Sequence, residues 1–491
     1  MRVRMRFRAL VLLAGCLLVI PIEAVAQAAG AQNAPAATPP VTGFVRDWTR
    51  VEMWSYFEPK PGGGDPDYAF IANRLQFGLE RHSRRYDLVG AGQYVEIGNL
   101  PANAVGPGPL GTGALYFDQG SGESSSRGVY LRYLNLRVKD ITPGWSIQAG
   151  RMGYTSGSES PSGDATIEAV KRQRVDAKLL GEFEWSHYQR GYDGVRTDID
   201  RPGWHATAGA FHPTQGGFEN DANVDIADIG VYSGTFTVKP HAVAHTDLTA
   251  FAIRYDDDRA VKARPDNTGK PAAAVDVHIS TYGATALWAS PPAQTPQIDL
   301  LGWLAAQTGD WYGDTHRAFA ATAEAGVRWT HAAWQPWLRG GFTHSSGDSD
   351  PTDAKHGTFF QVLPTVRKYS LSATYSVMNL NDGFVQVLAA PRPSLSVRFD
   401  LHQLSLASAA DRWYSGSGAT QRAGTVFGYS TRPSQGATGL GTVAEGSADY
   451  RMSRHFSING YVGGIHGGDV VAQTFAGRRL VFGYLETIVQ F

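Results

Sequence analysis

The sequence predicts an all-β protein, a transmembrane antiparallel β-barrel of about 18 strands with short periplasmic turns and long extracellular loops. Two observations carry this prediction. Segments in which apolar and polar residues alternate recur from residue 43 to the end of the 491-residue chain, and the connections between them are alternately short and long. A soluble sandwich or propeller has no reason to make every second connection long, whereas an outer-membrane barrel has tight turns at one rim and extended loops at the other.

The composition fits this class. Glycine reaches 57 residues, tyrosine 21 and tryptophan 12, and no apolar stretch after the first twenty residues approaches the roughly 18 to 20 residues of a membrane-spanning helix. The formal net charge is −1, so no nucleic-acid partner is indicated. Because no Pro- or Ser-rich linker divides the chain after residue 40, we expect one barrel domain over residues 43–491.

Residues 1–26 are predicted to be a secretory signal peptide. Four arginines fall within the first eight residues, an apolar run follows, and Ala24 and Ala26 have the spacing of a cleavage site. The alternative is a lipoprotein, since the stretch "LAGC" would make Cys16 a lipid anchor, but the apolar run continues through the cysteine. We expect residues 27–42 to form a flexible leader, too short to plug the barrel as in an energy-coupled transporter.

The connections fall into two length classes. The short ones are predicted at 81–85, 141–144, 200–203, 239–242, 291–296, 331–333, 390–394 and 452–455. The long ones, rich in glycine, aspartate and serine, are predicted near 59–69, 99–126, 153–186, 212–225, 256–273, 308–316, 344–366, 408–438 and 465–476. Together they join about 18 strands.

Tryptophan placement indicates where the membrane interface lies. Five of the twelve tryptophans sit within a few residues of short turns: Trp145, Trp204, Trp288, Trp329 and Trp334. An indole ring is favoured at the headgroup level, where its apolar body and its N–H each find a suitable environment. Tryptophans used only as core filler would not gather at one end of the strands, so we interpret this set as an aromatic girdle at the periplasmic rim.

Strand parity assigns the two faces of the wall. In "AFAATAEAGVRW", alternate residues from Phe319 to Trp329 are apolar and are opposed by Thr322, Glu324 and Arg328. In "SLSVRFDLH", the apolar set and the opposing polar set are Leu395, Val397, Phe399 and Leu401 against Ser396, Arg398, Asp400 and His402. The charged face cannot meet lipid, so it is predicted to line the lumen.

The last strand of the chain ends on a bare aromatic residue. In "GYLETIVQF", Leu485, Val489 and Phe491 share one parity, while Glu486 and Gln490 fall on the other. Soluble proteins usually let their ends fray. We therefore expect the final strand to close the barrel against the first, with Phe491 as the terminal signal that the barrel-assembly machinery reads.

Three motif blocks occur in series along the mature chain. The first is "IQAGRMGYTSG" followed by "RVDAKLLGEFEWSHYQRGYDGVRTD", the second "GGFTHSSGDSDPTDAKHGTFFQVLPTVRKYS", and the third "GTVAEGSADYRMSRHFSINGYVGGIHGGDV". In this order they resemble the alginate-export family of outer-membrane barrels. The resemblance implies an 18-stranded barrel that passes an anionic polysaccharide through an electropositive lumen. The sequence departs from the family pattern at Tyr192, where phenylalanine is usual before Asp193, and its strands carry no obvious excess of basic residues.

Charged side chains on the polar strand faces and in the segment from 167 to 196, where basic density is higher, are the candidate residues of the solute path. They are Arg74, Arg151, Arg174, Lys178, Arg190, Asp193, Arg196, Glu324, Arg328, Arg339, Arg398 and Asp400. Parity also places Glu80, Asp276, Glu445 and Asp449 on the lumen side, so the interior is mixed in charge. An arginine there can brace a carboxylate of the barrel or pair transiently with a carboxylate of a passing chain.

Segment 153–186 is far longer than a connection between adjacent strands requires, and such loops are usually functional or disordered. Its stretch "LLGEFEW" is apolar and aromatic, which argues against disorder. We expect the segment to fold inward and narrow the pore, bringing Arg174 and Lys178 to the solute path.

These features predict a passive outer-membrane channel for export or diffusion of an alginate-like anionic polysaccharide or a related acidic saccharide. The alternative is a general diffusion porin for small anionic or neutral solutes. An outer-membrane enzyme is less favoured, since no histidine lies in a recognisable nucleophile motif. The expected partners are outer-membrane lipid and lipopolysaccharide, the barrel-assembly machinery and the anionic saccharide. No cofactor or metal is expected.

The loop "GDSDPTD" contains residue types that could bind calcium. Asp348, Asp350 and Asp353 have a suitable spacing, yet the glycine and the terminal glutamate of a full binding loop are missing. A solvated loop is the favoured interpretation.

Overall fold

The computed structural model describes residues 41–105, 112–119, 122–222, 224–365 and 374–491. The predicted signal peptide, Cys16 and nearly all of the predicted leader lie outside the described residues, and the first strand begins at Thr42. Among the residues described, no helix has the length and apolar character needed to cross a membrane.

Eighteen strands of the described residues form a closed antiparallel barrel. They are β1 (Thr42–Ser55), β2 (Asp67–His82), β3 (Tyr86–Gly98), β4 (Ser126–Val138), β5 (Trp145–Met152), β6 (Tyr192–Asp200), β7 (Trp204–Pro213), β8 (Ile229–Val238), β9 (Thr246–Asp257), β12 (Val277–Ala289), β13 (Gln297–Trp311), β14 (Asp314–Arg328), β15 (Trp337–Ser345), β17 (Leu380–Arg392), β18 (Leu395–Ser405), β22 (Gly439–Arg451), β23 (Phe456–Gly467) and β24 (Arg479–Gln490). Each strand pairs with its neighbour along the chain, and β24 pairs with β1. The predicted fold class is therefore confirmed.

Shorter elements lie in the long connections. They are α1 (Thr112–Gln119), α2 (Ala165–Val170), the π-helical turn η1 (Lys171–Val175), β10 (Ala260–Ala263), β11 (Ala273–Ala274), β16 (Lys355–His356), β19 (Arg412–Gly416), β20 (Ala423–Gly424), β21 (Tyr429–Pro433) and α3 (Asp469–Thr474). β16 runs parallel to the start of β14, while β10, β11 and β20 form one small sheet and β19 and β21 another. The long loops thus carry their own hydrogen-bonded structure.

One predicted connection is wrong. The sequence indicated a long loop at 308–316, but β13 continues to Trp311 and β14 begins at Asp314. The two intervening residues, Tyr312 and Gly313, have φ values of 51° and 81°, as a two-residue hairpin turn with positive φ at both positions requires. Polar residues there made the strand ends resemble a loop.

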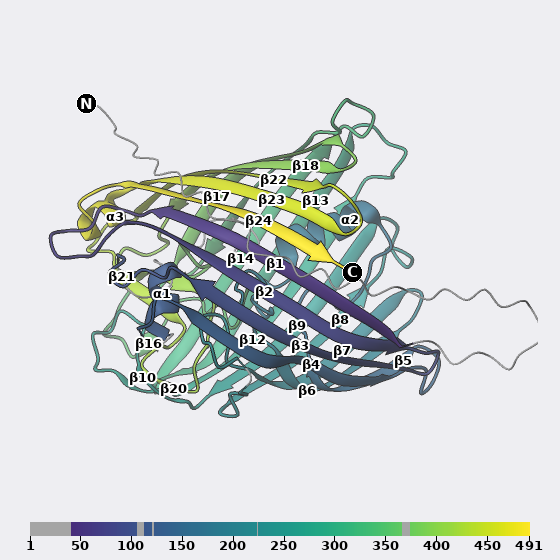
Figure 1. Ribbon diagram of the computed structural model, residues 1–491, viewed down its shortest axis with the longest axis horizontal. Helices are drawn as coiled ribbons and strands as arrows, with labels where there is room; N and C mark the ends of the chain where they lie inside the picture. The colour runs from purple at the N-terminus through teal and green to yellow at the C-terminus, as the bar shows by residue number, and fades with distance from the viewer. Residues whose placement is uncertain (1–40, 106–111, 120–121, 223, 366–373) are drawn as a thin grey trace, which may run out of the picture. The chain divides into compact units, whose positions relative to one another are not determined.

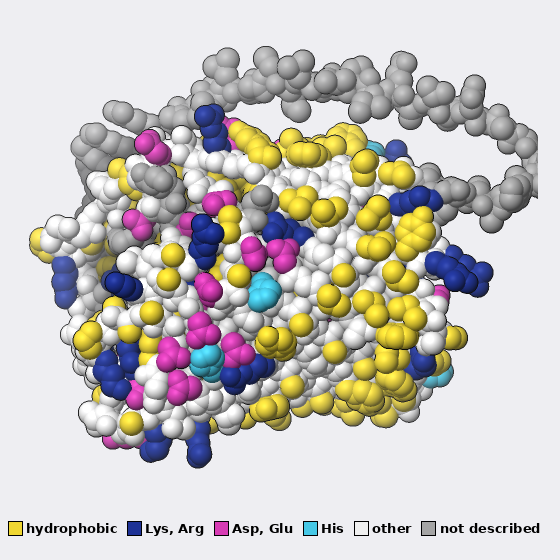
Figure 2. Space-filling model, turned by 90° about the horizontal axis from the view of Figure 1, so that it is seen from below, with side chains coloured by type: hydrophobic (Ala, Val, Ile, Leu, Met, Phe, Trp, Pro, Cys, Tyr) yellow, Lys and Arg dark blue, Asp and Glu magenta, His cyan; other side chains and the backbone are white. Residues whose placement is uncertain are grey.

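Wall residues alternate between the two faces, as predicted. On β13 and β14, Leu300, Leu304 and Phe319 are about half exposed, with fractions of 47%, 55% and 51%, whereas Trp303 and Glu324 are buried. Figure 2 shows one side of the molecule, where hydrophobic side chains gather towards the right and charged side chains towards the left. An outer apolar band with a polar, inward-facing set is the arrangement that lipid imposes on a barrel.

The barrel closes where the chain ends. β24 lies beside β1 (Figure 1) and pairs with it from Arg46↔Gln490 to Ser55↔Val481. Phe491 extends this pairing, since its N–H donates to Val45 O at 2.9 Å and its carbonyl accepts from Val45 N. Its ring is 72% exposed and stacks on His455. The expected closure of the first strand by the last is confirmed.

Candidate functional site inside the barrel

Residues 153–191, which connect β5 to β6, are called the inserted segment here. Asp164 caps α2 by accepting hydrogen bonds from the backbone N–H groups of Thr166 and Ile167. The inserted segment then contacts three separate strands: Thr166 Oγ1 bonds Gln297 of β13 at 3.0 Å, Lys171 pairs with Asp247 of β9, and Arg174 pairs with Glu324 of β14. These strand residues are buried and lie on the face opposite the exposed apolar residues. The segment therefore folds into the lumen, as expected.

Arg174 belongs to a buried cluster of four charges. Its Nε lies 2.9 and 3.0 Å from the two oxygens of Glu324. Glu324 also accepts from Arg339, at 3.0 Å, and Arg339 in turn donates to Asp299 at 2.9 Å. All four residues are at most 5% exposed. Two guanidinium groups and two carboxylates offset one another, so this cluster holds the inserted segment against the wall.

Lys178 lies in the same region but makes different contacts. Its Nζ donates to Thr322 Oγ1 at 3.2 Å and lies 4.6 Å above the ring of Trp303. A cavity of about 30 Å³ lies beside it, between the inserted segment and the wall, bordered also by Lys171 and Asp247. That volume accommodates only one or two water molecules, so the inserted segment packs closely against this side of the lumen.

Arg190 joins the inserted segment to two other long loops. Its guanidinium donates to the carbonyl oxygens of Leu363, Ser417 and Ala419 at 3.1, 2.8 and 3.1 Å. It is 1% exposed. A cation that is satisfied by carbonyl oxygens keeps its full positive charge, so Arg190 contributes to the potential inside the barrel while it fixes the loops.

The wall arginines predicted by parity face inward. Arg74 donates to the carbonyl oxygens of Glu184 and Ser186 and lies 4.1 Å from the ring centroid of Trp48. Arg196 and Arg398 each pair with a carboxylate on their own strand, Asp198 and Asp400 respectively. Arg328 donates to Gln335 in the following turn. Most of these side chains therefore brace the wall in this conformation.

Arg151 and Asp193 lie on the other face of the wall. They form a two-point ion pair, with distances of 2.7 and 2.6 Å, and are in register with each other on β5 and β6. Arg151 is also in register with Leu134, which is 53% exposed. The structure thus places this pair on the outer surface near the loop rim, although the sequence analysis included both residues in the solute path.

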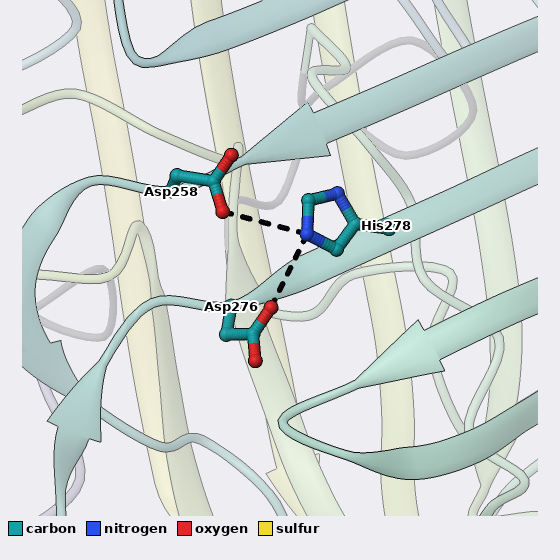
Figure 3. Close-up of side chains that lie close together, drawn as sticks. All are labelled: Asp258, Asp276 and His278. Atoms are coloured by element: carbon teal, nitrogen blue, oxygen red, sulfur yellow. Dashed lines mark ion pairs between the residues drawn. The ribbon is translucent and has the colours of Figure 1, made fainter.

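Asp276 was also assigned to the lumen and also lies outside. It forms, with Asp258 and His278, the cluster that Figure 3 shows, in which both carboxylates approach His278 Nε2, at 3.4 and 3.2 Å. His278 is in register with Asp256, and His278 Nδ1 lies 2.9 Å from Asp256 Oδ1. Asp258 and Asp276 are exposed. We refer to Asp258, Asp276 and His278 as the rim cluster.

The aspartates of the "GDSDPTD" loop bond within the loop itself. Asp350 accepts from the backbone and hydroxyl of Thr352, and Asp353 pairs with Lys355 at 2.8 Å. Asp348 accepts from the backbone N–H of Asp350, and burial raises the pKa of its carboxyl to about 6. Asp350 and Asp353 are thus engaged by their own neighbours, whereas Asp348 is buried and its Oδ2 has no partner among the described residues.

A family model described as alginate export matches residues 136–471. The chain belongs to the alginate export family. No curated protein matches it. The resemblance seen in the three motif blocks is confirmed, and the matched region runs from β4 to α3, including the whole inserted segment.

Solved outer-membrane barrels share the fold of this alginate export family member. OpdK from Pseudomonas aeruginosa aligns with a TM-score of 0.54 at 9% identity over 92% of this chain and 99% of its own. OccAB1 from Acinetobacter baumannii gives 0.57 at 9% identity over 92% and 97%. OccK2 (OpdF) from P. aeruginosa, solved in complex with glucuronate, gives 0.55 at 8% identity over 92% and 96%. Family and fold together place the protein in the bacterial outer membrane.

Sequence reasoning missed two charged groups that the alginate export barrel uses inside. Arg50 on β1 pairs with Glu52 and Glu486 and donates to Trp185 O at 2.9 Å. The alternation of polar and apolar residues in "RVEMW" could have predicted that Arg50 and Glu52 face the lumen. Arg132 on β4 pairs with Glu182 of the inserted segment, but it lies opposite a break in the β3–β4 register, so parity could not have placed it.

Proposed function

We propose that this protein is a passive outer-membrane channel for an anionic polysaccharide of the alginate type or a related acidic saccharide. The observation that carries the proposal is the family match over residues 136–471 on a closed 18-strand barrel whose lumen holds a cation-bearing inserted segment. We assign the protein a transport function and no catalytic activity, since the family is described by export.

The buried charges of the lumen suit attraction of carboxylates through the electrostatic potential that they create. Arg74 and Arg190 donate to backbone carbonyls, so a positive charge remains at each position. Guanidinium groups pair with carboxylates in a two-point geometry, and fixed charges in a narrow, poorly screened passage discriminate by sign more strongly than charges around a wide aqueous one. A polyuronate would experience the positive potential of these buried groups as it passes the inserted segment.

A porin for small acidic solutes is the second candidate. The close packing of the inserted segment against the wall around Lys178 favours it, as do structural relatives that were solved with vanillate and with glucuronate. Both candidates use the same inserted segment and differ in whether a polymer passes.

Assembly and surroundings follow from the barrel itself. The outer apolar band contacts outer-membrane lipid, and the loop rim faces lipopolysaccharide. We propose further that the barrel-assembly machinery recognises β24 and Phe491, whose exposed ring is available for recognition.

Single-channel recording in planar bilayers tests the proposal. The purified barrel is recorded in KCl, then with polyuronate and with a neutral dextran of matched length, and the reversal potential is measured across a salt gradient. The family-type function predicts an anion-preferring conductance that polyuronate blocks at concentrations where dextran does not. Block by monomeric glucuronate alone would favour the small-solute porin, and absence of any conductance would contradict both.

A further inference from the structure

Five polar side chains meet inside the lumen on three adjacent strands. β17 contributes Asp382 and Gln386, β18 contributes Asp400 and His402, and β22 contributes Glu445. Gln386 and Glu445 are both in register with Asp400. Each of the five is at most 2% exposed.

Several of these buried atoms have no hydrogen-bond partner within the described residues. They are His402 Nε2, Asp400 Oδ1 and both amide atoms of Gln386. An unpaired polar atom in the interior costs about 1–3 kcal/mol, and native proteins usually satisfy such atoms with water or an ion. Four such atoms on neighbouring residues therefore indicate that something polar binds between them.

The surrounding contacts orient these atoms towards one point. Asp382 Oδ1 lies 2.9 Å from His402 Nδ1, which leaves Nε2 to face the other strand. Arg398 engages Asp400 through Oδ2, so Oδ1 faces the cluster. Tyr461 donates to Glu445 Oε2 at 2.9 Å, and Glu445 Oε1 lies 4.0 Å from His402 Nε2. The donor atoms of Asp400, His402 and Glu445 all lie within 4.8 Å of one another.

We propose that Asp400, His402 and Glu445 bind one divalent transition cation of the Zn²⁺ type inside the lumen. One imidazole nitrogen with two carboxylate oxygens is a donor set that Zn²⁺ accepts, whereas Mg²⁺ and Ca²⁺ prefer oxygen alone. Ligands at about 2.0–2.2 Å from one ion lie up to about 4 Å apart, so a small movement of the side chains completes the site. Asp382 is the carboxylate that orients the histidine ligand, as is usual around metal-bound imidazole.

Charge and access agree with a bound cation. Asp382, Asp400 and Glu445 are three carboxylates, of which Asp400 pairs with Arg398 and Asp382 lies beside His402. Towards the short turns, the inward-facing Ser396 and Asp449 are exposed and in register with each other. The lumen is therefore open to solvent on the short-turn side of the cluster, and we expect an ion to enter from there.

The rim cluster provides a matched control because it also contains one histidine and two aspartates within 4.8 Å. It differs in being on the outer surface, and both nitrogens of His278 have carboxylate partners. If Zn²⁺ binds only to surface carboxylates, the measured binding will depend on the rim cluster. If Zn²⁺ binds inside the lumen, the measured binding will not depend on the rim cluster.

The experiment measures Zn²⁺ binding to the folded barrel after treatment with EDTA. Wild type, His278→Gln, His402→Gln, Glu445→Gln and Asp382→Asn are compared by calorimetry, with heat-modifiable migration as the check on folding. We expect one tight equivalent in wild type and in His278→Gln, its loss in His402→Gln and Glu445→Gln, and roughly 10–100-fold weaker binding in Asp382→Asn. X-ray absorption of the zinc-loaded protein should show a single imidazole among oxygen ligands.

Glu445→Gln retains an acceptor for the Tyr461 hydroxyl, so it should fold even if His402→Gln does not. The proposal is overturned if wild type binds no tight equivalent, or if the tight equivalent survives both lumen variants or disappears in His278→Gln. If the cluster binds only water, wild type will bind no tight equivalent of Zn²⁺.

Discussion

The wall around β13 and β14 and the inserted segment are built on different rules. In the wall, each residue's surroundings follow from its parity: Leu304 faces lipid and the next residue, Ala305, is buried. In the inserted segment, burial does not alternate with a fixed period. Arg172 is exposed, while Lys171 and Arg174 are buried in ion pairs. The wall is specified locally, and the segment is specified by partners far away in the chain.

This difference between the wall and the inserted segment means that substitutions in the two regions should affect different properties of the barrel. Removing an apolar residue from the wall affects how the barrel inserts, whereas removing an ion pair from the segment affects how the lumen is filled. Arg174 illustrates this, because its guanidinium attaches the inserted segment to the wall. Its contacts with Glu324 show that the charge is part of the packing.

The largest effect is expected from Arg174→Met. Removing one partner of a buried ion pair leaves carboxylate charge uncompensated and costs about 3–5 kcal/mol, so the inserted segment should detach from β14. Protease cleavage within residues 153–191 and urea unfolding of the refolded barrel measure this. Arg172→Met on the same turn is the matched control and should behave as wild type. Equal protection of the two variants would show that the ion pair does not hold the segment.

A lysine on the lipid face should have the next largest effect. Leu304 lies at the middle of β13 and is 55% exposed, so Leu304→Lys should destabilise the barrel by about 2–4 kcal/mol in a bilayer. Val243→Lys, in the β8–β9 turn, should cost only about 0–1 kcal/mol. Unfolding in liposomes measures both, and equal costs would mean that β13 does not cross the membrane at this depth.

Phe491→Ala tests the end of the wall. We expect several-fold less heat-modifiable protein in outer membranes with unchanged secretion to the periplasm. His455→Ala removes the ring on which Phe491 stacks but leaves the terminal residue in place, so it should assemble normally. If both variants assemble equally poorly, the phenyl ring acts by packing and not as a recognition signal.

The smallest effect is expected from pH acting on the outer loops. Burial raises the pKa of Asp348 to about 6 and also raises that of Asp411, which accepts from the Asp348 backbone. A raised carboxyl pKa means that docking of these loops is strongest below the ordinary value near 4 and weakens as pH rises through about 6. The change should be about 1 kcal/mol, reduced by solvent screening. Hydrogen exchange at pH 4 and pH 7 measures it, and Asp348→Asn should flatten the difference; a stronger docking at pH 7 would contradict the account.

Most of the wall could be predicted from the sequence because lipid enforces alternation. Phe319 to Trp329 could be assigned residue by residue, and the short turns revealed which rim was which. The prediction failed at Arg151, where "QAGRMG" contains two glycines and Gly150 has a φ of 115°, so there was no clear alternation to follow.

The inserted segment could be expected to fold inward from its length and aromatic content, but its partners could not. Glu324 is 150 residues from Arg174 in the chain, and nothing local links them. The buried cluster at His402 was partly visible, since parity placed Asp400, His402 and Glu445 on the lumen side. Their meeting at one point depends on the β18–β22 register, which the intervening loop conceals.

Conductance with and without the inserted segment tests the central claim most directly. In one variant, a short glycine-serine linker replaces residues 158–178, and single channels are compared with wild type across a KCl gradient. If the segment narrows the lumen, the variant should conduct several-fold more current, and its reversal potential should move towards zero as anion preference weakens. A shortened channel whose conductance and reversal potential both match wild type would contradict the account, because the segment would then not lie in the solute path.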